Sequence, residues 1–200
     1  MSGMSRSVRA ITAGAITAAL SFSTAAGAFA AESSSPQNGP NAASAASAQQ
    51  PKLAFSQLTS TVTERVHAQY PGASLLEVRA KTPGGGVQSI STWNFVYTAV
   101  KDNRQVTVLV DASVGGEVQP FTVVPHPWLG DRVLTMPIGM EPQQADKLLK
   151  KAGYTAPYKS VVLRHPLTWP VIENPLFIFN PGADGFVGVD VKTGEVKPLR

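Results

Sequence analysis

Apolar side chains recur at helical spacing in two parts of the chain. The first group is Phe55, Leu58, Val62 and Val66. Spacing of three or four positions predicts a helix of about four turns, and Pro71-Gly72 ends it because neither residue continues a helix well. A second helix is predicted from Pro142 to Gly153, with proline in the first turn and glycine as the C-terminal cap. Its buried stripe consists of Ala145, Leu148, Leu149 and Ala152.

Apolar and polar residues alternate after each predicted helix, and this period of two is typical of strands. In the first half we expect strands at residues 75–81, 93–99, 106–110 and 118–124. In the second half we expect them at residues 161–163, 176–179 and 186–191, followed by a hairpin at Lys192-Thr193-Gly194. Short connections favour antiparallel neighbours. The expected fold class is therefore α+β, with each helix covering one face of its own small sheet.

Two distant segments have nearly the same sequence. Residues 108–118 read VLVDASVGGEV, and residues 188–196 read GVDVKTGEV. Each contains a strand, an Asp, a turn with glycine and a Glu-Val that starts the returning strand. An internal repeat on this scale predicts two tandem helix-plus-antiparallel-sheet (αβββ) repeats, residues 53–124 and 140–200, joined by a connector at 125–139. The pattern leaves open whether the two sheets merge into one.

The N-terminal residues have the composition of a targeting signal. Arg6 and Arg9 precede an uncharged, Ala-rich stretch that closes on Ala28-Phe29-Ala30. This predicts a signal peptide over residues 1–30, cleaved after Ala30, and a secreted protein in the medium or the periplasm. Residues 31–52 are rich in Ser, Ala and Pro with no aromatic side chain, so we expect a disordered tether there.

Charge and cysteine content exclude several classes of function. Without Arg6 and Arg9, 15 of the 17 basic residues remain against 13 acidic ones, and they are dispersed, so nucleic-acid binding is not expected. The chain has no cysteine, which excludes disulfides and thiol catalysis. The Ala-rich stretch also holds too much Thr, Ser and Gly for a convincing membrane span, so the mature protein is not expected to be membrane-spanning.

The order of helices and hairpins resembles a known family. The helix that ends in YPG at residues 70–72, with the hairpin at 110–118, and the helix that ends in AGY at 152–154, with the hairpin at 189–196, resemble two tandem PepSY domains. The first hairpin departs from the family pattern by one inserted residue at 113–116. The resemblance implies exported binding and inhibitory modules. The plan is also similar in outline to the exported β-lactamase inhibitory proteins, which use disulfides that this chain cannot form.

Four carboxylates flank the repeated turns: Asp111, Glu117, Asp190 and Glu195. Hard cations and acid–base catalysis both use such groups, but at turns Asp commonly accepts hydrogen bonds from the backbone. The three histidines lack the spacing of a zinc site, and no nucleophile motif or phosphate-binding loop is present. We therefore expect no catalytic residue, no metal and no cofactor.

Two aromatic loops that contain proline form the candidate binding surface. The candidate partner-binding residues in them are His126, Trp128, Arg132, Arg164, His165 and Trp169. Proline stiffens a loop, and Trp beside Arg or His is typical of interface hot spots. Alternatively, Trp128 and Trp169 fold back and cover the ends of the sheet. The aromatic strand face of Trp93, Phe95 and Tyr97 is expected in the core, or else as an exposed platform.

The expected function is non-enzymatic binding of a protein partner, as an inhibitor or modulator of a secreted protease or hydrolase, or of a component of the cell envelope. Two alternatives stay open. A secreted hydrolase would need the turn carboxylates to converge in a pocket. A passive structural protein of the envelope would show neither such a pocket nor an exposed aromatic patch.

Overall fold

A computed structural model describes residues 51–168, 171–181 and 185–199. The predicted signal peptide, nearly all of the predicted tether and the candidate residue Trp169 lie outside the described residues. Among the helices of the described part, none has the length and apolar character that crossing a membrane requires.

The elements follow the predicted order in both halves. The first half contains α1 (Phe55–Gln69), β1 (Ser74–Lys81), a short 3-10 helix η1 (Val87–Ser89), β2 (Thr92–Lys101), β3 (Arg104–Ser113) and β4 (Thr122–Val124). The connector contains β5 (Asp131–Arg132). The second half contains α2 (Pro142–Lys151), β6 (Ser160–Pro166), β7 (Leu176–Phe179), β8 (Phe186–Asp190) and β9 (Val196–Leu199).

All strands of the described residues join one antiparallel sheet, in the order β4-β3-β2-β1-β6-β7-β8-β9, with β5 paired to β6 off this path. The two halves meet where β1 pairs with β6, from Glu77 opposite Arg164 to Lys81 opposite Ser160. The α+β class is thus confirmed, and the sheets of the two halves are continuous. From the β1–β6 pair outward, the strands of each half follow in chain order on their own side.

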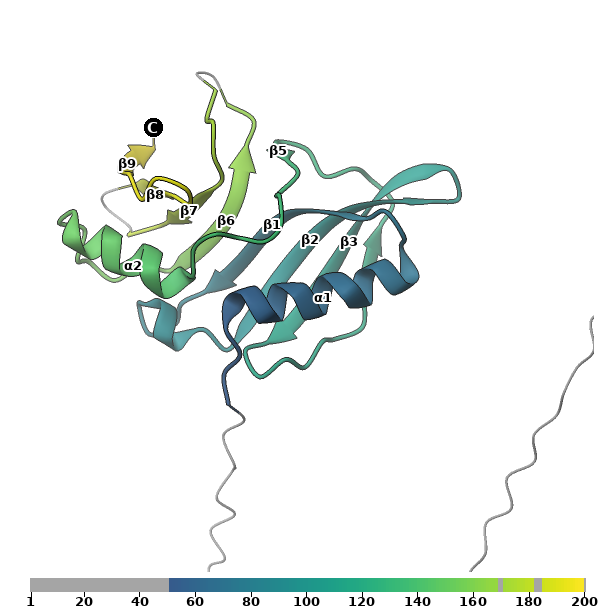
Figure 1. Cartoon of the computed structure of the whole chain (residues 1–200), viewed down its shortest axis with the longest axis horizontal. Coiled ribbons are helices and arrows are strands. Elements are labelled where there is room, and N and C mark those ends of the chain that lie inside the picture. The colour runs from purple at the N-terminus through teal and green to yellow at the C-terminus, as the bar shows by residue number, and fades with distance from the viewer. Residues whose placement is uncertain (1–50, 169–170, 182–184, 200) are drawn as a thin grey trace, which may run out of the picture. The chain divides into compact units, whose positions relative to one another are not determined.

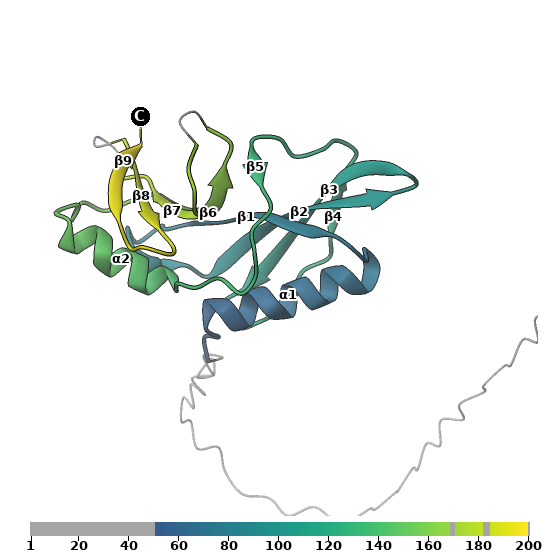
Figure 2. The ribbon, with the colours of Figure 1, turned by 45° about the horizontal axis from the view of Figure 1, so that its top comes forward.

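Both helices lie on the same face of this sheet (Figures 1 and 2). The main core lies between the helices and the sheet. Side chains alternate across a strand, so every second residue points toward the helices. These inward positions include the fully buried Phe95, Tyr97, Leu163 and Phe177, which belong to that core. The aromatic face of β2 is therefore core, as the first interpretation held.

Glu141 links the start of one helix to the other. It directly precedes α2, and its carboxylate oxygens accept hydrogen bonds from the backbone N–H groups of Phe55 (2.8 Å) and Ser56 (3.1 Å) in the first turn of α1. Helix N-termini carry unpaired donors and the positive end of the helix dipole, so a carboxylate there stabilises by about 1 kcal/mol. The second half of the chain thus caps the helix of the first half.

Several strands differ in length from the prediction. Strands β2 and β3 are each ten residues long, so both extend beyond the predicted ranges 93–99 and 106–110. Strand β4 starts at Thr122 instead of Val118, which forms only a single bridge to Ala112. Pro120 lies between them and has no N–H to continue the ladder. Strand β6 runs on to Pro166, because His165 and Pro166 pair with β5 beyond the last β7 pair at Arg164.

The two repeated segments form hairpin turns that are capped differently. In the first, Ser113 closes the turn with Glu117, and its hydroxyl accepts a hydrogen bond from the Glu117 N–H (3.1 Å). In the second, Asp190 closes the turn with Glu195, and one carboxylate oxygen accepts the N–H groups of Lys192 and Thr193 at 2.8 Å each. By turn geometry, the residue that corresponds to Asp190 is therefore Ser113. In the sequence repeat, by contrast, Asp190 aligns with Asp111.

Candidate binding groove

The face of the sheet away from the helices, called here the open face, carries a row of residues that crosses the second half. Directly paired residues share a face. From β1 to β9 the successive partners are Arg79, Val162, Ile178, Gly188 and Lys197. The row therefore has a basic residue at each end and apolar or small residues between them.

A groove of about 950 Å³ follows this row. Val162 and Ile178 form its floor, both half-buried, and Phe186 and Leu199 form its side near β9. Phe186 leaves 52% of its surface exposed. Gly188 is buried beside two leucines, since a Cβ there would lie 3.0 Å from Leu176 Cδ1 and 3.3 Å from Leu199 Cδ1. The second half thus presents an apolar surface that the described residues leave uncovered.

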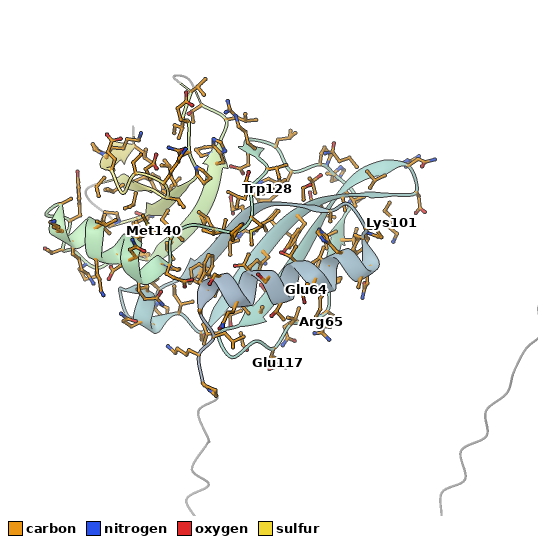
Figure 3. All side chains as sticks on the ribbon, in the orientation of Figure 1. Glu64, Arg65, Lys101, Glu117, Trp128 and Met140 are labelled. Atoms are coloured by element: carbon orange, nitrogen blue, oxygen red, sulfur yellow. The ribbon has the colours of Figure 1, made fainter. Side chains whose placement is uncertain are left out.

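Trp128 forms the opposite side of the groove. In Figure 3 it lies above the strands, while Glu64 on α1 lies below them. Its indole N–H donates to Asp131 Oδ2 at 2.9 Å, and the Arg79 guanidinium lies 5.5 Å from the centre of its ring. A hydrogen bond at one end and a cation–π contact on the ring hold the indole in one orientation.

A cluster of four charges, called here the charge cluster, lies under Trp128 and consists of Glu77, Arg79, Asp131 and Arg164. Arg164 Nε donates to Asp131 Oδ1 at 2.6 Å, and Arg164 Nη2 donates to the Gly130 carbonyl at 3.2 Å. Glu77 lies 3.5 Å from Arg79 and 4.0 Å from Arg164. The Asp131 side chain is completely buried, so it depends on Arg164 as its counter-ion.

Burial dominates the acid–base behaviour of Glu77. Its side chain is 5% exposed, and loss of solvent raises the pKa of this carboxyl above its ordinary value. The neighbouring Arg79 and Arg164 lower the pKa and Asp131 raises it, but burial outweighs the two arginines. Glu77 therefore takes up a proton more readily than an exposed glutamate.

The six candidate residues do not form one cluster. Trp128 and Arg164 both bind Asp131 and lie beside the groove. Arg132 and His165 are direct partners in the β5–β6 pair.

Two of the other candidates take little part in this site. His165 Nε2 donates to the Ile172 carbonyl at 2.9 Å, which fixes the ring against the loop after β6. The His126 side chain is exposed, and its backbone carbonyl accepts a hydrogen bond from the Thr107 hydroxyl at 2.7 Å. Trp169 lies outside the described residues.

Sequence reasoning missed Glu77, Arg79 and Asp131, and also the apolar floor of the groove. A signal for the floor was present, because residues 161–163 and 176–179 are apolar without alternation. Such runs indicate strands with apolar side chains on both faces. For the charges the signal was weaker, since a lone polar residue in a strand normally faces water.

The turn carboxylates that a hydrolase would use do not converge. Asp111 on β3 and Asp190 on β8 are separated by four strands, or about 24 Å at the usual strand spacing. Asp111 accepts the Asn94 amide at 2.8 Å, and Asp190 accepts the Asn174 amide at 3.0 Å. Neither lines the groove. Over the described ranges, no three His, Asp or Glu side chains gather closely enough to hold a metal ion.

Comparisons with protein-family models, with curated proteins and with solved structures find no match to this chain.

Proposed function

We propose that this chain is an exported, non-enzymatic binding module of two tandem PepSY-like units, which captures a segment of a partner protein in the groove of the open face. As an inhibitor or modulator of a secreted hydrolase, it would hold that segment against the apolar floor beside Trp128. The observation that carries the proposal is an apolar groove flanked by a tryptophan that the charge cluster holds in place.

Exposed apolar side chains around the groove support binding of a polypeptide. Besides Phe186, the loops beside the groove expose Leu129 at 82% and Leu167 at 56%. The two loops are tied together, because the Leu167 N–H donates to the Gly130 carbonyl at 2.8 Å. Contiguous exposed apolar surface with a polar rim is typical of protein interaction sites.

The edges of the sheet are less suited to a partner than its open face. Strand β4 has three residues, which is too short to guide a long added strand. Strand β9 contains Pro198 opposite Val187, and proline supplies no N–H to a ladder. Partner binding by strand addition is thus disfavoured at both ends, and the groove is the better candidate.

Preorganisation of the groove favours tight binding. Trp128 is fixed by Asp131, which is itself fixed by Arg164, so a partner would not have to order these side chains. Each side chain that is already immobile saves about 0.5–1.5 kcal/mol on association. Aromatic and arginine side chains in such settings are frequent hot spots.

Filling the groove tests the proposal. The mature chain is immobilised, exposed to culture supernatant and envelope extract of its source, and the retained proteins are identified by mass spectrometry. Val162→Trp should remove the specific partner, because a large side chain on the floor occupies the space that the partner needs. Leu109→Trp is the matched control, since Leu109 is a half-buried residue on the same face but outside the groove.

Both variants are first checked for native unfolding midpoints, so that loss of binding is separated from loss of fold. A partner that binds folded Val162→Trp as well as the unchanged chain would refute the proposal. The same holds if Leu109→Trp abolishes capture equally, since the interaction would then not involve the groove.

A further inference from the structure

The two ends of the groove row carry positive charge that the protein only partly neutralises. At the β9 end, Lys197 has no ion pair or side-chain hydrogen bond within the described residues, and its side chain borders the groove. At the β1 end, Arg79 keeps 42% of its side chain exposed. Its Nε donates to the Asn94 amide oxygen, and its Nη1 faces Glu77. Among the described residues Nη2 has no acceptor, so it can donate to a carboxylate of a partner.

Charges within the site do not balance. Two carboxylates, Glu77 and Asp131, face three cations, Arg79, Arg164 and Lys197, and both carboxylates lie at the β1 end. Burial moreover favours the neutral form of Glu77. The groove therefore presents excess positive charge at its ends and apolar surface in its middle.

The length of the row sets the spacing of complementary groups. Arg79 and Lys197 are separated by four strand spacings, or about 19 Å at about 4.8 Å each. An extended peptide rises about 3.3 Å per residue, so six steps cover about 20 Å. Residues at even steps point to the same side, which places side chains one, three, five and seven of a heptapeptide toward the row.

We propose that the groove recognises an extended peptide segment with carboxylates at positions one and seven and apolar side chains at positions three and five. The terminal carboxylates meet Arg79 and Lys197, and the two apolar side chains lie about 7 and 13 Å along the row, on either side of Ile178. This specificity rests on the proposed function, because it names the chemistry of the segment that the groove would capture. Charge complementarity at the ends selects the segment, and apolar burial in the middle supplies most of the affinity.

The probe is a blocked heptapeptide, acetyl-Glu-Thr-Leu-Thr-Leu-Thr-Glu-amide, titrated into the isotopically labelled mature chain and followed by amide chemical shifts. We expect saturable changes in the amide chemical shifts of Ile178, Gly188 and Lys197. The affinity obtained from them should fall as salt concentration rises. The matched peptides carry Gln or Lys in place of both Glu residues. Gln should weaken binding about two- to fivefold per end, which is the range of exposed ion pairs, and Lys should weaken it further.

Variants of the protein assign the effect to a residue. Lys197→Gln should lower the affinity for the Glu-ended peptide about two- to fivefold and leave that for the Gln-ended peptide unchanged. Lys192→Gln is the matched control, because it removes the same charge from an exposed turn outside the groove. Lys197→Glu should reverse the preference toward the Lys-ended peptide.

Several results would overturn the inference. Equal affinity for Glu-ended and Gln-ended peptides would show that terminal carboxylates are not recognised, although the groove would still be a binding site. Binding of none of the three peptides would overturn it as well, and the capture experiment with Val162→Trp would then decide the proposed function independently. Tighter binding of dodecanoate that depends on Lys197 would indicate a lipid carboxylate instead. Shifts of the same amides with protein concentration alone would indicate a second copy of the chain.

Discussion

The two halves of the sheet follow one plan but differ on the open face. In the first half this face mixes apolar positions with polar pairs, and its apolar members include Leu109 and the 70% exposed Val100. The polar pairs are hydrogen-bonded: Asn94 donates to Asp111 at 2.8 Å, and Gln105 donates to Thr98 at 3.0 Å. In the second half the described residues leave the apolar side chains of the groove uncovered, and Phe186 is more than half exposed. Hydrogen-bonded polar pairs thus interrupt the apolar positions of the first half, whereas the second half has an apolar groove floor. Two halves with the same order of helix and strands can therefore differ in their open face.

The turns show the same kind of divergence. One hydroxyl of Ser113 caps the first turn, whereas the carboxylate of Asp190 accepts two backbone N–H groups and the Asn174 amide. Burial alone would raise the pKa of Asp190, but these donors together hold it below its ordinary value. A similar sequence thus acquires a strong cap in one half and a weak cap in the other.

Removing the cation of the charge cluster should have the largest effect on stability. Arg164→Met leaves the buried Asp131 carboxylate without its counter-ion, and breaking a buried pair in this way costs about 3 kcal/mol. Urea unfolding of the variant measures the loss. Arg132→Met, on the neighbouring exposed position of β5, should change the free energy of unfolding by less than about 0.5 kcal/mol. Equal losses would show that the cluster does not hold the connector on the sheet.

A smaller effect should separate the two turns. Asp190→Ala removes the acceptor of three hydrogen bonds and should cost about 2 kcal/mol, and Ser113→Ala should cost about 1 kcal/mol or less. Asp190→Asn keeps an acceptor and should lie between them. Thermal unfolding of the three variants ranks the caps, and a ranking with Ser113→Ala as the most damaging would break the comparison.

The smallest expected effect is a pH dependence of opposite sign at two carboxyls. The lowered pKa of Asp190 means that its stabilisation is present above pH 3.8, its unfolded value, and is lost as pH falls through the folded pKa. The raised pKa of Glu77 means that stability falls as pH rises from 4.5 through the folded pKa, because the folded state then loses a proton that it binds more tightly than the unfolded state.

Free energies of unfolding between pH 2 and 7 for the unchanged chain, Glu77→Gln and Asp190→Asn isolate these two contributions. The advantage of Glu77→Gln over the unchanged chain should grow with rising pH, and the deficit of Asp190→Asn should shrink as pH falls below 4. Parallel curves for all three proteins would contradict both assignments.

Much of the secondary structure followed from local pattern. The helix at residues 55–69 and the alternation from Trp93 to Ala99 are strong periodic signals, and the structure has both elements. The joining of the sheets did not follow, because the pairing of β1 with β6 depends on contacts about 85 positions apart that no local pattern encodes. Tandem duplication itself stays a prediction.

The candidate site was half visible in the sequence. Trp128 and Arg164 stood out by residue type and by proline-rich context, and they do lie together. Their partners could not be found in this way. Asp131 becomes a buried counter-ion only when the connector folds over β1 and β6, and Arg79 meets Trp128 only in that arrangement.

Pairing of β1 with β6 also protects the molecule from self-association. A fragment that ended before the connector would leave the backbone N–H and C=O groups of β1 unpaired along residues 77–81, and an unpaired strand edge can pair with a strand of another molecule. Because β1 meets β6 in antiparallel register, two copies of such a fragment could satisfy each other around a two-fold axis. Keeping both halves on one chain makes this strand pairing intramolecular and independent of protein concentration.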